Sequence, residues 1–198
     1  RCTYCHWVVH VGSSQGEMDL YLDSLATEMD LYKRTLGVEA PAPSSVLIGG
    51  GTPSILSPSQ TERLLSTLRA GFDLSNCTQI TCELEPTTVL GAVGLDKLRA
   101  MKAQGVNRVS LGVQSFHDKA LADMGRHHSV SDAVEAIAQV RRAGIESLSL
   151  DLIYGYAGCT PREWLETLDT AFSLDIDACQ LYRLRIVPHG EKVGAVKA

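Results

Sequence analysis

The stretch Ser147-Leu148-Ser149-Leu150-Asp151-Leu152-Ile153-Tyr154-Gly155 has the composition of a β-strand closed by a glycine. Similar runs, rich in Val, Ile, Leu and Thr, occupy residues 45–48, 79–84, 108–113 and 179–187. Several are nearly continuous in apolar residues, as expected of parallel strands covered on both faces. Their centres recur roughly every 30 to 40 residues, the length of one strand and one helix. The sequence therefore predicts an α/β fold.

The segments between these strands carry helix start and stop signals. Ser57-Pro58-Ser59-Gln60 and Thr160-Pro161-Arg162-Glu163 each combine an N-cap hydroxyl, a proline at the first helical position and a capping Gln or Glu. Ser129 begins a weaker version of the same pattern. A further helix is expected over about residues 17–36. The residues predicted to follow helix ends in the left-handed conformation are Gly71, Gly105 and Gly144.

The pattern contains five strands and five helices, and a helix precedes the first strand. We expect a leading strand to lie outside the chain, so residues 1–198 would be a core domain truncated at both ends. With that strand restored, the pattern predicts a partial (βα)6 barrel resembling a TIM barrel, with its site where strands end. A doubly wound open sheet is the alternative, because both folds need right-handed β-α-β crossovers.

Composition excludes several classes of protein. The chain has 18 Lys plus Arg against 23 Asp plus Glu and no basic block, which argues against general nucleic-acid binding. The sequence has no run of about 18 apolar residues that would predict a membrane span. The first residues do not resemble a signal peptide. Six cysteines are too few for a disulfide scaffold. We expect a cytoplasmic protein with reduced thiols.

Residues typical of binding and catalytic sites follow successive strands. Barrel topology would bring them to one mouth, and this convergence is more informative than any single cluster. They are Cys2 and Cys5, the run Gly49-Gly50-Gly51-Thr52-Pro53, the pair Glu83 and Glu85, Gln114, and Asp151.

Each cluster alone has a simpler interpretation. A C-x-x-C is often half of a zinc site, but no second half follows; a thioredoxin-type pair would need a preceding β-α context. The glycines could form only a tight turn, although they also permit close backbone approach to a ligand; no Walker lysine follows them. Glu83 could be a structural acid and Arg126 a surface ion-pair partner.

Taken in order, these residues resemble the radical S-adenosylmethionine (SAM) superfamily, in the branch that holds oxygen-independent coproporphyrinogen III oxidase and its haem-chaperone relatives. The resemblance spans nearly the whole chain. It rests on Cys2–Cys5, Gly49–Ser54, Gly105–Phe116, Gly125–His128 and Asp151–Gly155.

The resemblance implies a [4Fe–4S] cluster and SAM as cofactors. Cys2, Tyr4 and Cys5 match the second half of the family motif C-x-x-x-C-x-aromatic-C, whose first cysteine would lie four positions before Cys2. In the family three thiolates hold the cluster and leave one iron open for SAM.

The same resemblance assigns roles around SAM. The run Gly49, Gly50, Gly51 and Thr52 corresponds to the loop that receives the methionine amino group. Arg126 corresponds to the partner of the methionine carboxylate, a role that suits a planar guanidinium. The polar set around the ribose and methionine moieties would be Glu83, Gln114 and Asp151, and residues 153–155 would line the adenine.

The resemblance leaves three functions open: oxidation of a porphyrinogen such as coproporphyrinogen III, haem chaperoning without oxidase activity, and radical methyl transfer or cyclopropanation. A tetrapyrrole substrate and a reductant such as flavodoxin or ferredoxin are the implied partners; no catalytic residue can be named. The segment 179–192 is the least typical. Arg183, Arg185 and His189 would share one strand face there, either recognising carboxylates or a second SAM, or only charging a sheet edge.

Overall fold

Five strands form one parallel sheet in the order β1-β2-β3-β4-β5. The computed structural model describes residues 2–5 and 10–184. A doubly wound sheet reverses its strand order at a switch point, whereas this order follows the chain without reversal. The expected partial β/α barrel is therefore confirmed. The strands are β1 (Ser45–Ile48), β2 (Gln79–Leu84), β3 (Arg108–Gln114), β4 (Ser147–Tyr154) and β5 (Ala178–Arg183).

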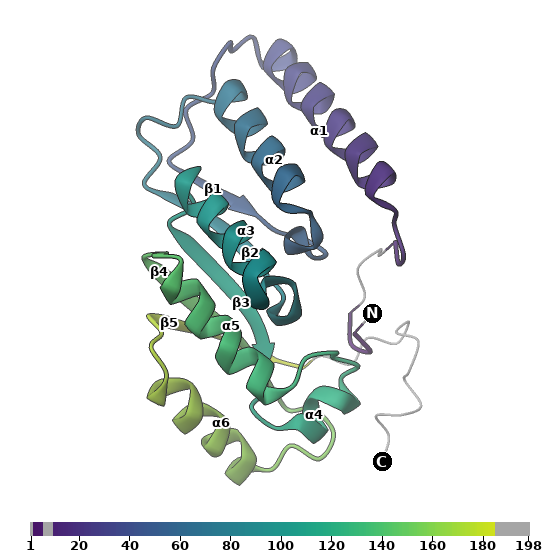
Figure 1. Ribbon diagram of the computed structural model, residues 1–198, viewed down its shortest axis with the longest axis vertical. Helices are drawn as coiled ribbons and strands as arrows, with labels where there is room; N and C mark the ends of the chain where they lie inside the picture. The colour runs from purple at the N-terminus through teal and green to yellow at the C-terminus, as the bar shows by residue number, and fades with distance from the viewer. Residues whose placement is uncertain (1, 6–9, 185–198) are drawn as a thin grey trace.

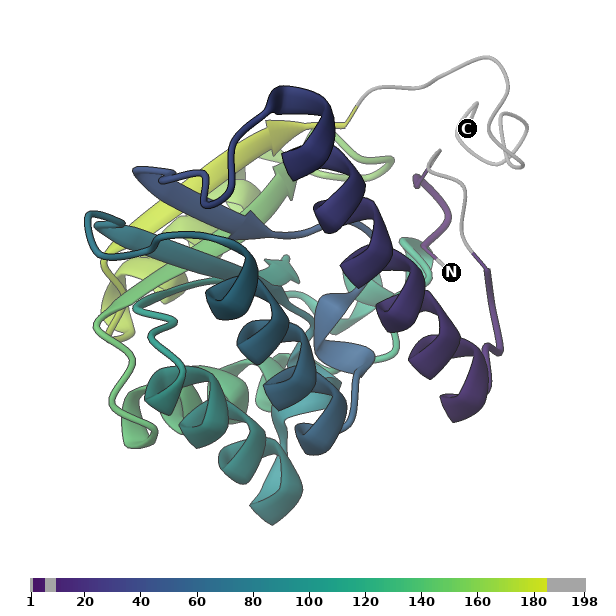
Figure 2. The ribbon, with the colours of Figure 1, turned by 90° about the horizontal axis from the view of Figure 1, so that it is seen from above.

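The connecting helices lie along one face of the sheet (Figures 1 and 2). They are α1 (Gln15–Leu36), α2 (Pro58–Gly71), α3 (Gly91–Ala103), α4 (Asp118–Asp123), α5 (Val130–Arg142) and α6 (Pro161–Ser173), with short 3-10 turns η1 (Pro53–Ile55) and η2 (Pro86–Val89). Within the described ranges, no helix has both the length and the apolar character needed to cross a membrane.

Alternation along the strands divides the sheet into two faces. Cys82, Leu111 and Leu150 point toward the helices and belong to the main hydrophobic core. Cys82 is 2% exposed, and burial raises the pKa of its thiol to about 12. Glu83 and Asp151, on the opposite face, therefore line the concave side of the barrel segment.

The cap predictions are confirmed at most positions. Ser57, Ser129 and Thr160 each form a complete capping box, and the backbone φ is 88° at Gly105 and 76° at Gly144. The prediction for Gly71 is wrong: Gly71 is the last residue of α2, and the chain leaves through an extended Phe72.

Two further boundaries differ from the expectation. The short helix α4 has no counterpart in the sequence pattern, because six residues are too few to show a helical period. Strand β5 ends at Arg183, and residues 185–187 of the expected strand lie outside the described residues.

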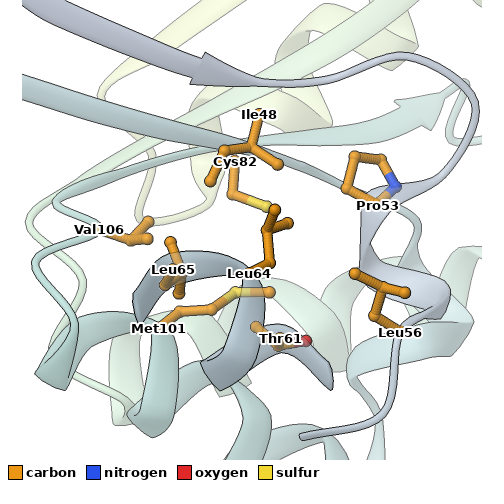
Figure 3. A pocket seen from close by; sticks show the side chains of 9 residues that line it. All are labelled: Ile48, Pro53, Leu56, Thr61, Leu64, Leu65, Cys82, Met101 and Val106. Carbon is orange, nitrogen blue, oxygen red and sulfur yellow. The ribbon is translucent and has the colours of Figure 1, made fainter. Parts of the chain in front are cut away.

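A small apolar cavity of about 10 Å³ lies between α2, α3 and the first two strands (Figure 3). Thr61 is one of its lining residues. Among the residues that the structure describes, none bonds the buried Thr61 Oγ1. The cavity is far too small for a cofactor.

Candidate cofactor site

The loop after β1 allows very close approach of the backbone to a carboxylate. Gly50 and Gly51 are consecutive residues in the left-handed region, with φ values of 83° and 61°. A Cβ on Gly49 would lie 2.7 Å from Cδ of Glu83, so a side chain there would displace the Glu83 carboxylate. The Gly50 N–H donates to Glu83 Oε2 at 2.9 Å. The glycine run and Glu83, predicted separately, therefore form one unit, from which Thr52 leads into η1.

Gln114, at the end of β3, holds an unusual backbone conformation. Its φ of 69° is the one positive value among the described non-glycine residues, and such outliers cluster at functional sites. The β3–β4 register shifts between Leu111 and Gln114. A Cβ on Gly112 would lie 2.8 Å from Gln114 Nε2. Gly112 thus makes room for the Gln114 side chain at the strand end.

Arg126 connects this strand end to the cysteine segment. Its side chain is 10% exposed. Nη1 donates to Cys2 Sγ at 3.1 Å, and Nη2 donates to the Gly112 carbonyl at 2.8 Å. The buried Nε has no hydrogen-bond partner among the described residues. The guanidinium therefore lies beside Cys2 and has an unused donor at Nε.

The segment Cys2–Cys5 is held in place by α4. The Thr3 N–H donates to the Met124 carbonyl at 3.0 Å, and Tyr4 packs on the cluster that contains Leu121 and Ile153. The Cys5 N–H donates to the Cys2 carbonyl at 3.3 Å. The helix that the sequence pattern missed thus positions both predicted ligands, which are half-buried.

Glu85 and His128 form a second buried pair next to Arg126. Glu85 Oε1 lies 3.4 Å from Arg126 Nη2 and 3.2 Å from His128 Nδ1. Burial opposes ionisation of Glu85, but the hydrogen bonds from His128 and Thr87 and the charge of Arg126 outweigh it and lower the pKa of Glu85. Glu85 was predicted to lie at a strand end and His128 belongs to the motif Gly125–His128, but neither residue had a specific role in the sequence-based prediction.

Asp151 ends a chain of hydrogen bonds on the concave face. Ser110 Oγ donates to Asp151 Oδ1 at 2.9 Å, Gln180 Nε2 donates to Ser110 Oγ at 3.0 Å, and the Tyr182 hydroxyl donates to Gln180 Oε1 at 2.8 Å. Burial raises the pKa of Asp151 to about 6 and Glu83 adds to this, while the Ser110 bond opposes it. Sequence reasoning missed the partners, because hydroxyl and amide side chains on strands are common.

The predicted residues thus meet in two groups at the carboxyl ends of the strands. The glycine run and Glu83 form one, with Asp151 close enough to Glu83 for their charges to interact; Cys2, Gln114 and Arg126 form the other. Arg183 does not join them: alternation places it on the Cys179 side of β5, away from Gln180. Arg185 and His189 lie outside the described residues.

The donor set fits SAM and part of a cluster site. A carboxylate suits the Arg126 guanidinium, whose Nε is unused, and an ammonium group suits the Glu83 carboxylate in the glycine cradle. Within the described residues, no three His, Cys, Asp or Glu side chains are grouped closely enough to hold a metal. Cys2 and Cys5 would therefore supply two thiolates and need a third ligand from elsewhere.

Comparison with known proteins places the chain in a family. It matches the Radical SAM superfamily over residues 1–171. It is 33% identical over 191 residues to the heme chaperone HemW of Bacillus subtilis, covering 94% of this chain and 48% of that protein. The chain spans about half the length of the curated relatives it matches.

Solved structures agree. Coproporphyrinogen III oxidase from Escherichia coli, described as a radical SAM enzyme, gives a TM-score of 0.79 at 29% identity, covering 94% of this chain and 42% of that one. A radical SAM methyltransferase from Kitasatospora setae, with cobalamin and a [4Fe–4S] cluster bound, gives 0.61 at 17% identity, with coverages of 96% and 36%, and shows the fold alone. The expected cofactor pair is confirmed at the level of the family. The chain belongs to the radical SAM superfamily.

Proposed function

We propose that this chain binds SAM at the carboxyl ends of β1–β4, beside a [4Fe–4S] cluster held in part by Cys2 and Cys5. The observation that carries the proposal is the Arg126 guanidinium, which is almost fully buried, reaches Cys2 Sγ at 3.1 Å and has an unused Nε. An arginine so desolvated and so close to a predicted ligand is suited to a small anion bound next to the metal.

The described residues divide the recognition of SAM between them. Arg126 would hold the methionine carboxylate, and the loop Gly49–Thr52 with Glu83 would hold the amino group. Gln114 and Asp151 would contact the rest of the methionine and the ribose. When bound, the cofactor pair supplies reductive cleavage of the SAM sulfonium bond.

We propose a tetrapyrrole as the substrate class, with residues 1–198 as the radical SAM core. The relative named as a heme chaperone favours haem binding, and the structural likeness to coproporphyrinogen III oxidase keeps oxidative decarboxylation as a second candidate. A flavodoxin or ferredoxin would supply the electron. Full-length protein that binds haem but does not convert coproporphyrinogen III would support the chaperone; conversion would support the oxidase.

The cofactor assignment is tested by anaerobic reconstitution of the full-length protein with iron and sulfide. We expect SAM cleavage to 5′-deoxyadenosine under a strong reductant. Cys5→Ala should abolish the [4Fe–4S] absorbance and the cleavage, whereas Cys159→Ala, in a loop before α6, should retain both. A full cluster in Cys5→Ala would refute the ligand assignment, and no cleavage by an intact-cluster sample would refute the enzymatic function.

A further inference from the structure

His128 uses both ring nitrogens although its side chain has no exposed surface. Nδ1 lies 3.2 Å from Glu85 Oε1, and Nε2 lies 3.0 Å from the Val113 carbonyl oxygen. A buried histidine normally donates from one nitrogen and accepts at the other. Here both nitrogens face oxygen atoms, so the positions of the hydrogens on the His128 and Glu85 side chains can be inferred.

The neighbours of His128 favour one arrangement of protons. A main-chain carbonyl only accepts, so Nε2 carries a hydrogen. Glu85 Oε2 accepts from the Thr87 N–H at 2.9 Å, and Oε1 is approached by Arg126 Nη2 at 3.4 Å as well as by His128. Both carboxylate oxygens are thus approached by donors, and the lowered pKa of Glu85 keeps the carboxyl ionised, so Nδ1 also donates. This makes His128 an imidazolium paired with an ionised Glu85.

This charge state resolves a conflict at the SAM site. With a neutral His128, Glu85 would cancel the charge of Arg126 and repel the methionine carboxylate in a partly desolvated site. With an imidazolium, Arg126, Glu85 and His128 together keep one net positive charge. Glu85 can then orient the guanidinium without neutralising it.

We propose that His128 is a positioning and charge-balancing residue, which neutralises Glu85 so that Arg126 stays available to the carboxylate of SAM. The identity of the ligand rests on the proposed function, whereas the protonation of His128 does not depend on it. Besides Arg126, which lies against the same carboxylate oxygen, Asp132 of α5 is close enough to His128 for their charges to interact, and its carboxylate already accepts from the Ser129 N–H and hydroxyl. Asp132 adds negative potential and favours the imidazolium further.

The proton count is measured on full-length protein before any cofactor is added. Histidine labelled with ¹⁵N reports whether each ring nitrogen carries a hydrogen. We expect both nitrogens of His128 to carry a hydrogen, because each of them faces an oxygen atom that acts as an acceptor. A bare nitrogen on His128 would overturn the proposal. Because SAM is absent, this result is independent of the proposed function.

The charge-balancing role is measured as SAM affinity of reconstituted protein. His128→Gln leaves Glu85 uncompensated and should weaken SAM binding about tenfold. Adding Glu85→Gln to that variant removes the stray charge and should recover most of the loss, whereas His127→Gln should bind like wild type. A double variant as weak as His128→Gln would show a purely structural role and overturn the proposal. Absence of SAM binding by wild type would refute the proposed function instead.

Discussion

Asp151 and Glu85 are both largely buried carboxylates, yet their surroundings move their pKa values in opposite directions. Asp151 has one hydrogen-bond donor, Ser110, and the charge of Glu83 nearby, so burial dominates and raises its pKa to about 6. Glu85 has an imidazole, a guanidinium and Thr87 around it, and its pKa is lowered. Partners, more than depth, decide the protonation of each acid.

Asp151→Asn should stabilise the protein at neutral pH. A raised folded-state pKa gives stability that is fully present below the unfolded value near 4 and is lost as the pH rises through about 6. Because solvent screens the charge of the partly exposed Asp151, we expect the substitution to increase the free energy of unfolding by about 1–2 kcal/mol at pH 8. Urea unfolding at pH 4 and at pH 8 measures it.

The control for this substitution is Asp96→Asn, which alters an exposed aspartate on α3. It should change the free energy of unfolding by less than about 0.5 kcal/mol at either pH. The raised pKa would be contradicted if Asp151→Asn were no more stable relative to wild type at pH 8 than at pH 4.

The sequence indicated site residues by position in the motif but not by their contacts. Gly49 and Glu83 were expected at neighbouring strand ends, and the structure brings them together. His128 belongs to the motif Gly125–His128, but neither it nor Lys97 had a predicted role of its own, because the role of a single histidine or lysine depends on partners that lie far away in the chain. Their chemistry is set by tertiary contacts.

At the scale of elements, Lys97 ties the turns that follow β1 and β2. Its buried Nζ donates to the carbonyls of Ser54 in η1 and Thr88 in η2, and the Glu85 N–H donates to Ser54 Oγ. These bonds fix the exit of the glycine run against the start of the turn that carries Glu85. These bonds therefore help to hold the two turns in place beside the site.

Gly94 on α3 should tolerate no side chain. A Cβ there would lie 2.1 Å from the main-chain carbon of Val89, at the end of η2. Although alanine is the better helix former, Gly94→Ala should destabilise the protein by about 2–3 kcal/mol in urea unfolding, because α3 must move away from η2.

Gly16→Ala is the matched control, since Gly16 is helical and has open space around the added methyl group. It should be neutral or stabilising by up to about 1 kcal/mol. Equal effects of the two substitutions would show that the close packing of α3 on η2 is not present in solution.

A substitution in the lining of the cavity beside α2 should stabilise the protein. Thr61 lines it, and its buried hydroxyl lacks a partner among the described residues. A water there would also lack the two or more polar partners it needs. Thr61→Val should therefore stabilise the protein by about 1 kcal/mol, measured as an increase in the urea midpoint.

Thr67→Val, on the same helix, is the control. Thr67 Oγ1 donates to the Arg63 carbonyl at 2.9 Å, so its hydroxyl is satisfied and its loss should not stabilise. A decrease in stability for Thr61→Val would mean that the hydroxyl has a partner in solution.

At the scale of the whole molecule, the strands were predictable because buried parallel strands are nearly continuous runs of apolar residues. Three of them match the expected bounds, over residues 45–48, 79–84 and 147–154. The choice between barrel and doubly wound sheet was not predictable from the local repeat, because strand order is a long-range property. The helix α4 was missed because its six residues are too few to show a helical period, and its contact with the cysteine segment spans more than 100 residues.

The central claim is that Arg126, beside Cys2, binds the carboxylate of SAM next to the cluster. The most direct test is the dissociation constant for SAM of reconstituted full-length protein, compared among wild type, Arg126→Ala and Arg99→Ala. Arg99 is an exposed arginine on α3 and serves as the control. We predict that Arg126→Ala weakens SAM binding about tenfold or more while its [4Fe–4S] absorbance is retained. Unchanged affinity in Arg126→Ala with an intact cluster would contradict the account.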